Sequence, residues 1–140
     1  MKVLLDTNVI LDVLLNRSPF FTSSRLVFEL AEQKWITGYI TASSITDVFY
    51  IINKEVKDKE KVYQVIEKLT ALFSIVLVSE TTIVKALELR WRDFEDAVQF
   101  MAAKENNIAY IITRNEIDYK NSDIQCINPT DFIAYFNRSR

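Results

Sequence analysis

Residues 2–12, Lys-Val-Leu-Leu-Asp-Thr-Asn-Val-Ile-Leu-Asp, begin with a short apolar run and pass through a polar triplet into a second apolar segment. The first run, Lys2 to Leu5, has the length and composition of a buried strand. Asp6, or one of the two polar residues after it, can cap a helix that begins near Val9, because the side-chain oxygens of Asp, Asn and Thr accept hydrogen bonds from the free N–H groups of a first turn. This stretch therefore predicts a strand that leads directly into a helix, with a carboxylate at the junction.

The rest of the chain continues this alternation of short and long apolar segments. Four further short runs are strand-like: residues 36–41, 75–78, 109–112 and 124–127. Longer segments between and after them have apolar residues at helical spacing: 45–52, 61–73, 94–102 and 131–136. Strands that alternate with helices favour an α/β fold in which both faces of a parallel sheet are covered.

Length and composition predict one domain that spans residues 1–140. With 140 residues, 49% of them hydrophobic, the chain can bury one continuous core. The single cysteine, Cys126, cannot form an internal disulfide, which fits a reducing, cytoplasmic setting. Met1 leads straight into the first strand, and no apolar run is long enough to cross a bilayer. We therefore expect a soluble protein with no membrane partner.

The chain has no histidine, and this excludes several hydrolytic mechanisms. A Ser-His-Asp triad, an HExxH zinc site and an imidazole acid/base pair all require that residue. A single glycine also leaves no glycine-rich phosphate loop. The net charge of −2 gives no general attraction for nucleic acid, so a polyanion would have to be held locally. Carboxylate ligands and a metal ion remain as a route to hydrolysis.

Acidic and amide side chains follow the predicted strands or begin the helices after them. They are Asp6, Asp47, Asp93, Asp96, Asn115 and Asp118. In an open parallel sheet, ligands bind beyond the carboxyl ends of the strands, so these oxygen atoms should gather at one end of the sheet. Several carboxylates together suit Mg²⁺ or Mn²⁺, which prefer hard oxygen ligands and are often completed by a substrate phosphate.

Helix capping offers a second interpretation of the same residues. Asp6 can cap the first helix, while Ser44 with Asp47 and Asp93 with Asp96 have the spacing of capping boxes. Capping explains each acid separately but gives no reason for the acids to converge. Like charges a few ångströms apart would raise the carboxyl pKa values and cost stability unless a cation neutralised them. Convergence would therefore indicate a metal site.

Three blocks of the sequence resemble the signature blocks of PIN-domain nucleases. They are Leu4–Asp12, Asp93–Gln99 and Ile112–Tyr119, and their order and approximate spacing match as well. Asn128–Phe132 resembles the closing strand-to-helix turn of that family, so the resemblance covers nearly the whole chain. It implies a three-layer α/β/α sandwich around a central parallel sheet and metal-dependent endoribonuclease activity. It also implies frequent service as the toxin of a VapBC-type toxin–antitoxin pair, and formation of a homodimer.

The resemblance also implies roles for individual residues. Asp6, Asp47 and Asp96 would be the first three acidic ligands, and Asn115 or Asp118 the fourth. Supporting roles would belong to Thr7 and Asn8, which orient Asp6, to Asp93, and to Thr113, whose hydroxyl would lie near the metal or the attacking water. Arg114, beside this group, is the candidate for substrate binding. We expect Asp12 and Glu95 at the surface or just behind the ligands.

Two residues depart from the family pattern. The second acid is often Glu, so Asp47 has less reach, and Asn115 stands where many members carry Asp. These departures motivate an alternative, a catalytically silent PIN-like module that binds RNA or protein. A receiver-like phosphoacceptor domain is a third hypothesis, but Val3-Leu4 and Arg114 stand where it would need an acidic pair and a lysine.

The leading hypothesis is a Mg²⁺- or Mn²⁺-dependent ribonuclease. Water would attack phosphorus and leave a 5′-phosphate and a 3′-hydroxyl. The sequence predicts no RNA target, because base recognition depends on loop shape and single-strand contacts. We expect the aromatic side chains to pack in or near the core. Phe20 and Phe21 are the exceptions, as candidate contacts to a second copy or an antitoxin.

Overall fold

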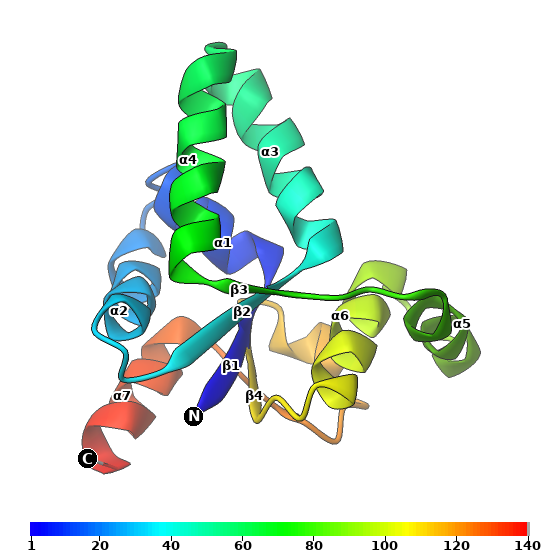
Figure 1. Ribbon diagram of the computed structural model, residues 1–140. Coiled ribbons are helices and arrows are strands. Elements are labelled where there is room, and N and C mark those ends of the chain that lie inside the picture. Colours follow the sequence, from blue (N-terminus) through cyan, green and yellow to red (C-terminus); the bar gives the residue numbers. More distant parts are fainter. Residues whose placement is uncertain (140) are drawn as a thin grey trace.

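The computed structural model describes residues 1–139, in which helices and strands alternate as predicted (Figure 1). The elements are β1 (Lys2–Leu5), α1 (Thr7–Leu14), α2 (Phe21–Glu32), β2 (Thr37–Thr41), α3 (Ala42–Val56), α4 (Lys59–Leu72), β3 (Ser74–Val76), α5 (Glu80–Leu89), α6 (Phe94–Glu105), β4 (Tyr110–Ile112), the 3-10 helix η1 (Glu116–Tyr119), β5 (Gln125–Ile127) and α7 (Pro129–Ser139). No helix within these residues is long and apolar enough to cross a membrane.

The sheet has five parallel strands in the order β3-β2-β1-β4-β5. The chain starts at the central strand β1, moves outward to β2 and β3, and then returns to the other side of β1 for β4 and β5. The connections therefore reverse direction between β1 and β4, where Leu5 pairs with Ile112 and the Asp6 N–H donates to the Ile112 carbonyl at 2.9 Å. Such a reversal point is where open α/β sheets bind their ligands.

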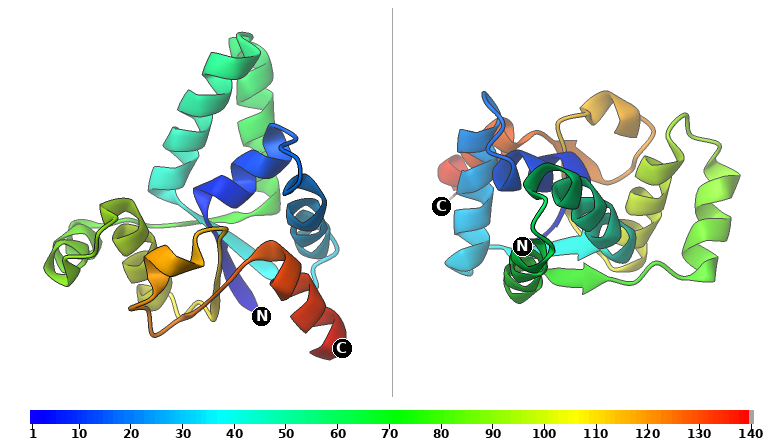
Figure 2. Two further views of the ribbon diagram at one scale, coloured as in Figure 1. Left: turned by 180° about the vertical axis from the view of Figure 1, so that it is seen from behind. Right: turned by 90° about the horizontal axis from the view of Figure 1, so that it is seen from above.

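The two faces of the sheet are covered by different helices. Side chains alternate along β1, so Val3 and Leu5 join the core on one face and Leu4 joins the core on the other. The first core also contains apolar residues of α1, α2, α3, α4 and α7, whereas the second contains residues of α5, α6 and η1. Figures 1 and 2 show these two helical layers on either side of the strands. The predicted three-layer α/β/α fold is confirmed.

Three helices of the structure, α2, α5 and η1, have no predicted range, and α3 has a different start. Helix α5 was not predicted, because Ile83 and Ala86 pack in the core while Val84 and Leu87 are exposed, so its apolar residues form no single stripe. Helix α3 begins earlier than the predicted cap at Ser44. The Thr41 hydroxyl is its N-cap and accepts a hydrogen bond from the Ser44 N–H at 3.2 Å. Asp47 therefore lies in the second turn of α3.

Candidate metal centre

Asp6 lies at the end of β1, almost fully buried, and its carboxylate is held from several sides. Oδ1 accepts hydrogen bonds from the Thr7 backbone N–H and from Gln99 Nε2, each at 2.7 Å. Oδ2 accepts one from Thr113 Oγ1 at 2.7 Å, and the Tyr119 hydroxyl lies 3.3 Å away. Burial raises the pKa of Asp6, and these hydrogen bonds oppose the rise. Four separate segments thus fix the orientation of one carboxylate.

Asp96 lies in the first turn of α6 and faces Asp6 across the Tyr119 hydroxyl. That hydroxyl is 3.1 Å from Asp96 Oδ1 and 3.3 Å from Asp6 Oδ2, so it bridges the two carboxylates. Only 6% of Asp96 is exposed. Burial, followed by the charges of Asp6 and Asp93, raises the pKa of Asp96 to about 7. Negative charge on this side chain is therefore costly unless a cation is near.

Asp93, Asp96 and Asp118 form the tightest acidic cluster of the described chain. One carboxylate oxygen of each lies within 4.8 Å of the other two. Asp93 is the N-cap of α6, because its side chain accepts a hydrogen bond from the Asp96 N–H at 3.1 Å, and Asp118 belongs to η1. Carboxylate oxygens are hard donors, and a cluster of three of them fits a divalent cation such as Mg²⁺ or Mn²⁺. Asp93 is therefore both the N-cap of α6 and a member of the acidic cluster.

Asp47 does not belong to this cluster but lies close to another acid of the same region. It is exposed in the second turn of α3. Burial, the charge of Asp47 and then the charge of Asp6 raise the pKa of Glu95. Glu95 also accepts a hydrogen bond from the Thr7 hydroxyl at 3.4 Å. Glu95 lines a cleft of about 210 Å³ together with Asp6, Asp93, Asp96 and Asn115, whereas Asp47 lies outside this lining.

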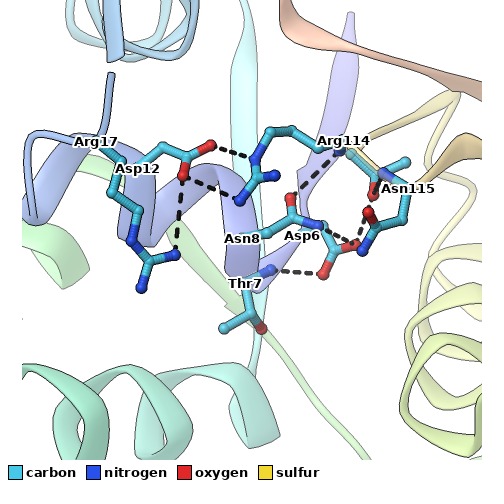
Figure 3. A network of polar contacts seen from close by, with 8 residues as sticks. Asp6, Thr7, Asn8, Asp12, Arg17, Arg114 and Asn115 are labelled. Carbon is cyan, nitrogen blue, oxygen red and sulfur yellow. Dashed lines mark hydrogen bonds and ion pairs between the residues drawn. The ribbon is translucent and has the colours of Figure 1, made fainter. Parts of the chain in front are cut away.

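The predicted supporting residues lie around Asp6, as Figure 3 shows for the turn after β1. Thr113 is fully buried, and its hydroxyl donates to Asp6 while it accepts from the Asn115 N–H at 3.0 Å. Asn8 Oδ1 accepts from the Arg114 N–H at 3.3 Å, and Asn8 Nδ2 lies 3.5 Å from Asp6 Oδ2. The turns after β1 and β4 are thereby fastened to each other.

Asp12 is fully buried behind this site and holds the candidate substrate-binding arginine. Arg114 Nε and Nη2 donate to the two carboxylate oxygens of Asp12 at 2.6 and 3.2 Å, and Arg17 Nη1 lies 3.9 Å from Oδ1 (Figure 3). Paired donors of this kind fix the plane of a guanidinium group. Arg17 lines the acidic cleft, so positive charge stands beside the carboxylates.

Sequence reasoning missed Gln99 and Tyr119 as parts of the site. Gln99 follows Asp96 by three residues on α6, and this spacing places the two side chains on one helix face. That spacing was the available signal for Gln99. Tyr119 is adjacent to the predicted ligand Asp118, but nothing in the sequence indicated that its hydroxyl would contact Asp6. Its pKa is raised well above the ordinary value, first by burial and then by the two carboxylates, which keeps the hydroxyl protonated as a donor.

Comparison with known proteins supports the same fold. The family model described as PIN domain matches residues 2–116. No curated protein has a matching sequence. FitAcB from Neisseria gonorrhoeae superimposes with a TM-score of 0.73 at 20% identity, over 91% of this chain and 98% of that chain. A toxin–antitoxin complex from Klebsiella pneumoniae gives a TM-score of 0.69 at 19% identity, over 91% and 97%. VapC20 from Mycobacterium tuberculosis, a Sarcin–Ricin loop cleaving toxin, gives 0.62 at 14% identity, over 78% and 86%.

Proposed function

We propose that this chain, which belongs to the PIN domain family, is a metal-dependent endoribonuclease with a single domain over residues 1–140. The observation that carries the proposal is the cluster of Asp93, Asp96 and Asp118 beside the buried carboxylate of Asp6. Acids from the turn after β1, the start of α6 and η1 meet at the point where the sheet connections reverse. This arrangement is costly for the folded chain alone and favourable once a cation is bound.

Asp93, Asp96 and Asp118 would hold a Mg²⁺ or Mn²⁺ ion, with Asp6 facing it. Bound there, the ion would stabilise the charge that develops on a phosphodiester and lower the pKa of a water molecule. Hydrogen bonds from Thr7, Gln99 and Thr113 hold Asp6, so the position of its carboxylate is fixed before substrate binds. Glu95 adds negative charge at the cleft, and Asp47, which lies outside the cluster, would bind the ion through a water molecule.

Arg17 and Arg114 would bind the phosphates of the substrate. Both guanidinium groups are tied to Asp12, which is 0% exposed, and both remain partly open to solvent. Arginine forks match phosphate oxygens in geometry and charge. Local positive charge of this kind explains how a chain with a net charge of −2 can hold a polyanion. Attack of water on phosphorus would leave a 5′-phosphate and a 3′-hydroxyl.

Structures with a similar fold support RNA as the substrate and an antitoxin as a partner. VapC20 is a Sarcin–Ricin loop cleaving toxin, and two other neighbours are a FitAB complex bound to DNA and a toxin–antitoxin complex. By analogy with them, we propose that this chain is the toxin of a toxin–antitoxin pair. We further propose that it acts in the cytoplasm and forms a homodimer. Analogy at the level of fold supplies the hypothesis, and the acidic site supplies its chemistry.

Cleavage of end-labelled RNA with and without Mn²⁺ tests this function. The parent should cut only with the metal, and Asp96→Asn and Asp118→Asn should each lower the rate by at least a hundredfold, because they remove charge from the cluster. Asp93→Asn should also lower it, whereas Asp58→Asn should not. Asp93 and Asp58 are both exposed N-caps, of α6 and α4, so the pair separates the loss of a ligand from the change of a cap. Equal rates in Asp96→Asn and the parent would reject the site, and RNA binding without cleavage would favour the silent module.

A further inference from the structure

A second and larger cavity has Arg114 in its wall, one residue before Asn115 of the acidic cleft. Its volume is about 550 Å³, and its lining includes Pro19, Phe20, Ser24, Arg114, Glu116 and Pro129. These residues come from the start of α2, the turn between β4 and η1, and the start of α7. A volume of this size falls in the range of small-molecule and cofactor sites and is large enough for a nucleoside.

Consecutive residues connect this cavity to the proposed metal centre. Arg114 lines the larger cavity, and the next residue, Asn115, lines the acidic cleft. The guanidinium of Arg114 is held in place by the buried carboxylate of Asp12 and stands over the ring of Phe20, 4.0 Å from the ring centroid. A single strand with one phosphate in the cleft would therefore have its neighbouring base within reach of Phe20 and Arg114.

The cavity combines an aromatic surface with polar atoms for hydrogen bonding. Phe20 is 40% exposed, and aromatic rings and arginine planes are the usual stacking surfaces for unpaired bases. Ser24 is fully buried, and its hydroxyl has no hydrogen-bond partner among the described residues. Because the hydroxyl oxygen is buried, it lies behind the cavity surface and is not within reach of a ligand. One Glu116 oxygen accepts from Asn128 Nδ2 at 2.9 Å, which orients the carboxylate at the cavity.

We propose that this cavity binds the nucleobase next to the phosphodiester that is cut, and thereby selects the position of cleavage. The ring face of Phe20 that is turned away from Arg114 would stack on the base, and the Glu116 carboxylate would accept a hydrogen bond from it. This inference rests on the proposed ribonuclease function, because it takes the RNA chain from the acidic cleft into the neighbouring cavity. It assigns Phe20 to substrate, where the sequence alone suggested a protein contact.

Nucleotide binding to the metal-free protein tests the cavity directly. We expect calorimetric or NMR titration in EDTA to show binding of at least one of the four nucleoside 5′-monophosphates, with much weaker binding of ribose 5-phosphate. Phe20→Ala should weaken nucleotide binding about tenfold through loss of one stack. Tyr50→Ala is the matched control, because Tyr50 is also exposed and carries a cation, Lys54 Nζ, at 4.2 Å from its ring, yet it does not line the cavity.

The outcomes separate this inference from the proposed function. If ribose 5-phosphate binds as tightly as every nucleotide, the cavity is a phosphate site only and the base site is overturned. Unchanged nucleotide binding in Phe20→Ala would also overturn the base site. Cleavage maps of a mixed-sequence RNA with Mn²⁺ add a second measurement. If the parent cuts and Phe20→Ala cuts the same positions at the same rate, the base site fails and the nuclease stands. If nucleotides bind as expected but no RNA is cut, the nuclease and the selection of a cleavage position fail, and the cavity stands as a nucleotide-binding site.

Discussion

The titration of Asp96 gives a prediction for the metal-free protein. Its pKa of about 7, compared with an ordinary 3.8, means that the folded state holds a proton that the unfolded state releases. The stabilisation from this proton is complete below pH 4 and is lost as the pH rises through about 7. Asn has no such proton to lose. From pH 5 to pH 8, the free energy of unfolding of Asp96→Asn should therefore rise relative to that of the parent, by on the order of 3 kcal/mol.

Urea unfolding in EDTA at these two pH values measures the difference. Asp58→Asn, the exposed cap of α4, serves as the control and should show the same difference from the parent at both pH values. A constant difference between Asp96→Asn and the parent would mean that the Asp96 carboxylate is not buried against Asp6 and Asp93 as the structure indicates.

Residues of the site differed in how well the sequence could predict them. Asp6 and Asp96 follow from residue type and from their positions at the start of helices, which are local properties. The roles of Asp12 and Tyr119 are not local, because each depends on partners about a hundred residues away in the chain or on another element. Asp12 was expected at the surface or behind the ligands, and the structure buries it completely behind them.

Among the elements, the strands were predictable as short apolar runs, because a parallel sheet is covered on both faces. The amphipathic helices were predictable from the helical spacing of their apolar residues. The boundary of α3 was not predictable from the capping pattern, since Thr41 and Ser44 are both suitable caps, and the end of β2 at Thr41 selects the first. The earlier start places Asp47 in the second turn of α3 instead of the first.

Strand β2 contains the only glycine, and its environment predicts a destabilising substitution. A methyl group on Gly38 would overlap the ring of Phe73, which is 2% exposed and packs edge-on against Phe28 at 4.9 Å. Because the ring has little room to move, Gly38→Ala should lower the free energy of unfolding by about 1–3 kcal/mol. Urea unfolding measures this, and adding Phe73→Leu should make the Gly38→Ala cost smaller. An unchanged stability in Gly38→Ala would show that Phe73 adapts freely.

At the scale of the whole molecule, the strand order explains why acids far apart in sequence meet. The position of β1 next to β4 joins Asp6 to Thr113, and α6 and η1 on one face of the sheet bring Asp96 and Asp118 to the same edge. The sequence predicted that the acids would gather, since all strands end at one edge. It could not predict which acids would be nearest, because that depends on how far each helix carries its side chain from the strand.

Asp118 lies within the acidic cluster and Asp47 lies outside it, and this contrast gives a prediction for metal binding by the intact protein. An ion held by Asp93, Asp96 and Asp118 would join α6 to η1, so Mn²⁺ should raise the melting temperature, with about 2.7 kcal/mol of stabilisation at a hundredfold excess over the Kd. Asp118→Asn should lose most of this increase, whereas Asp47→Asn should keep most of it, because Asp47 lies outside the cluster. Thermal unfolding of the three proteins with and without Mn²⁺ measures the effect. An equal loss in Asp47→Asn would show that Asp47 reaches the ion and that the cluster alone does not define the metal centre.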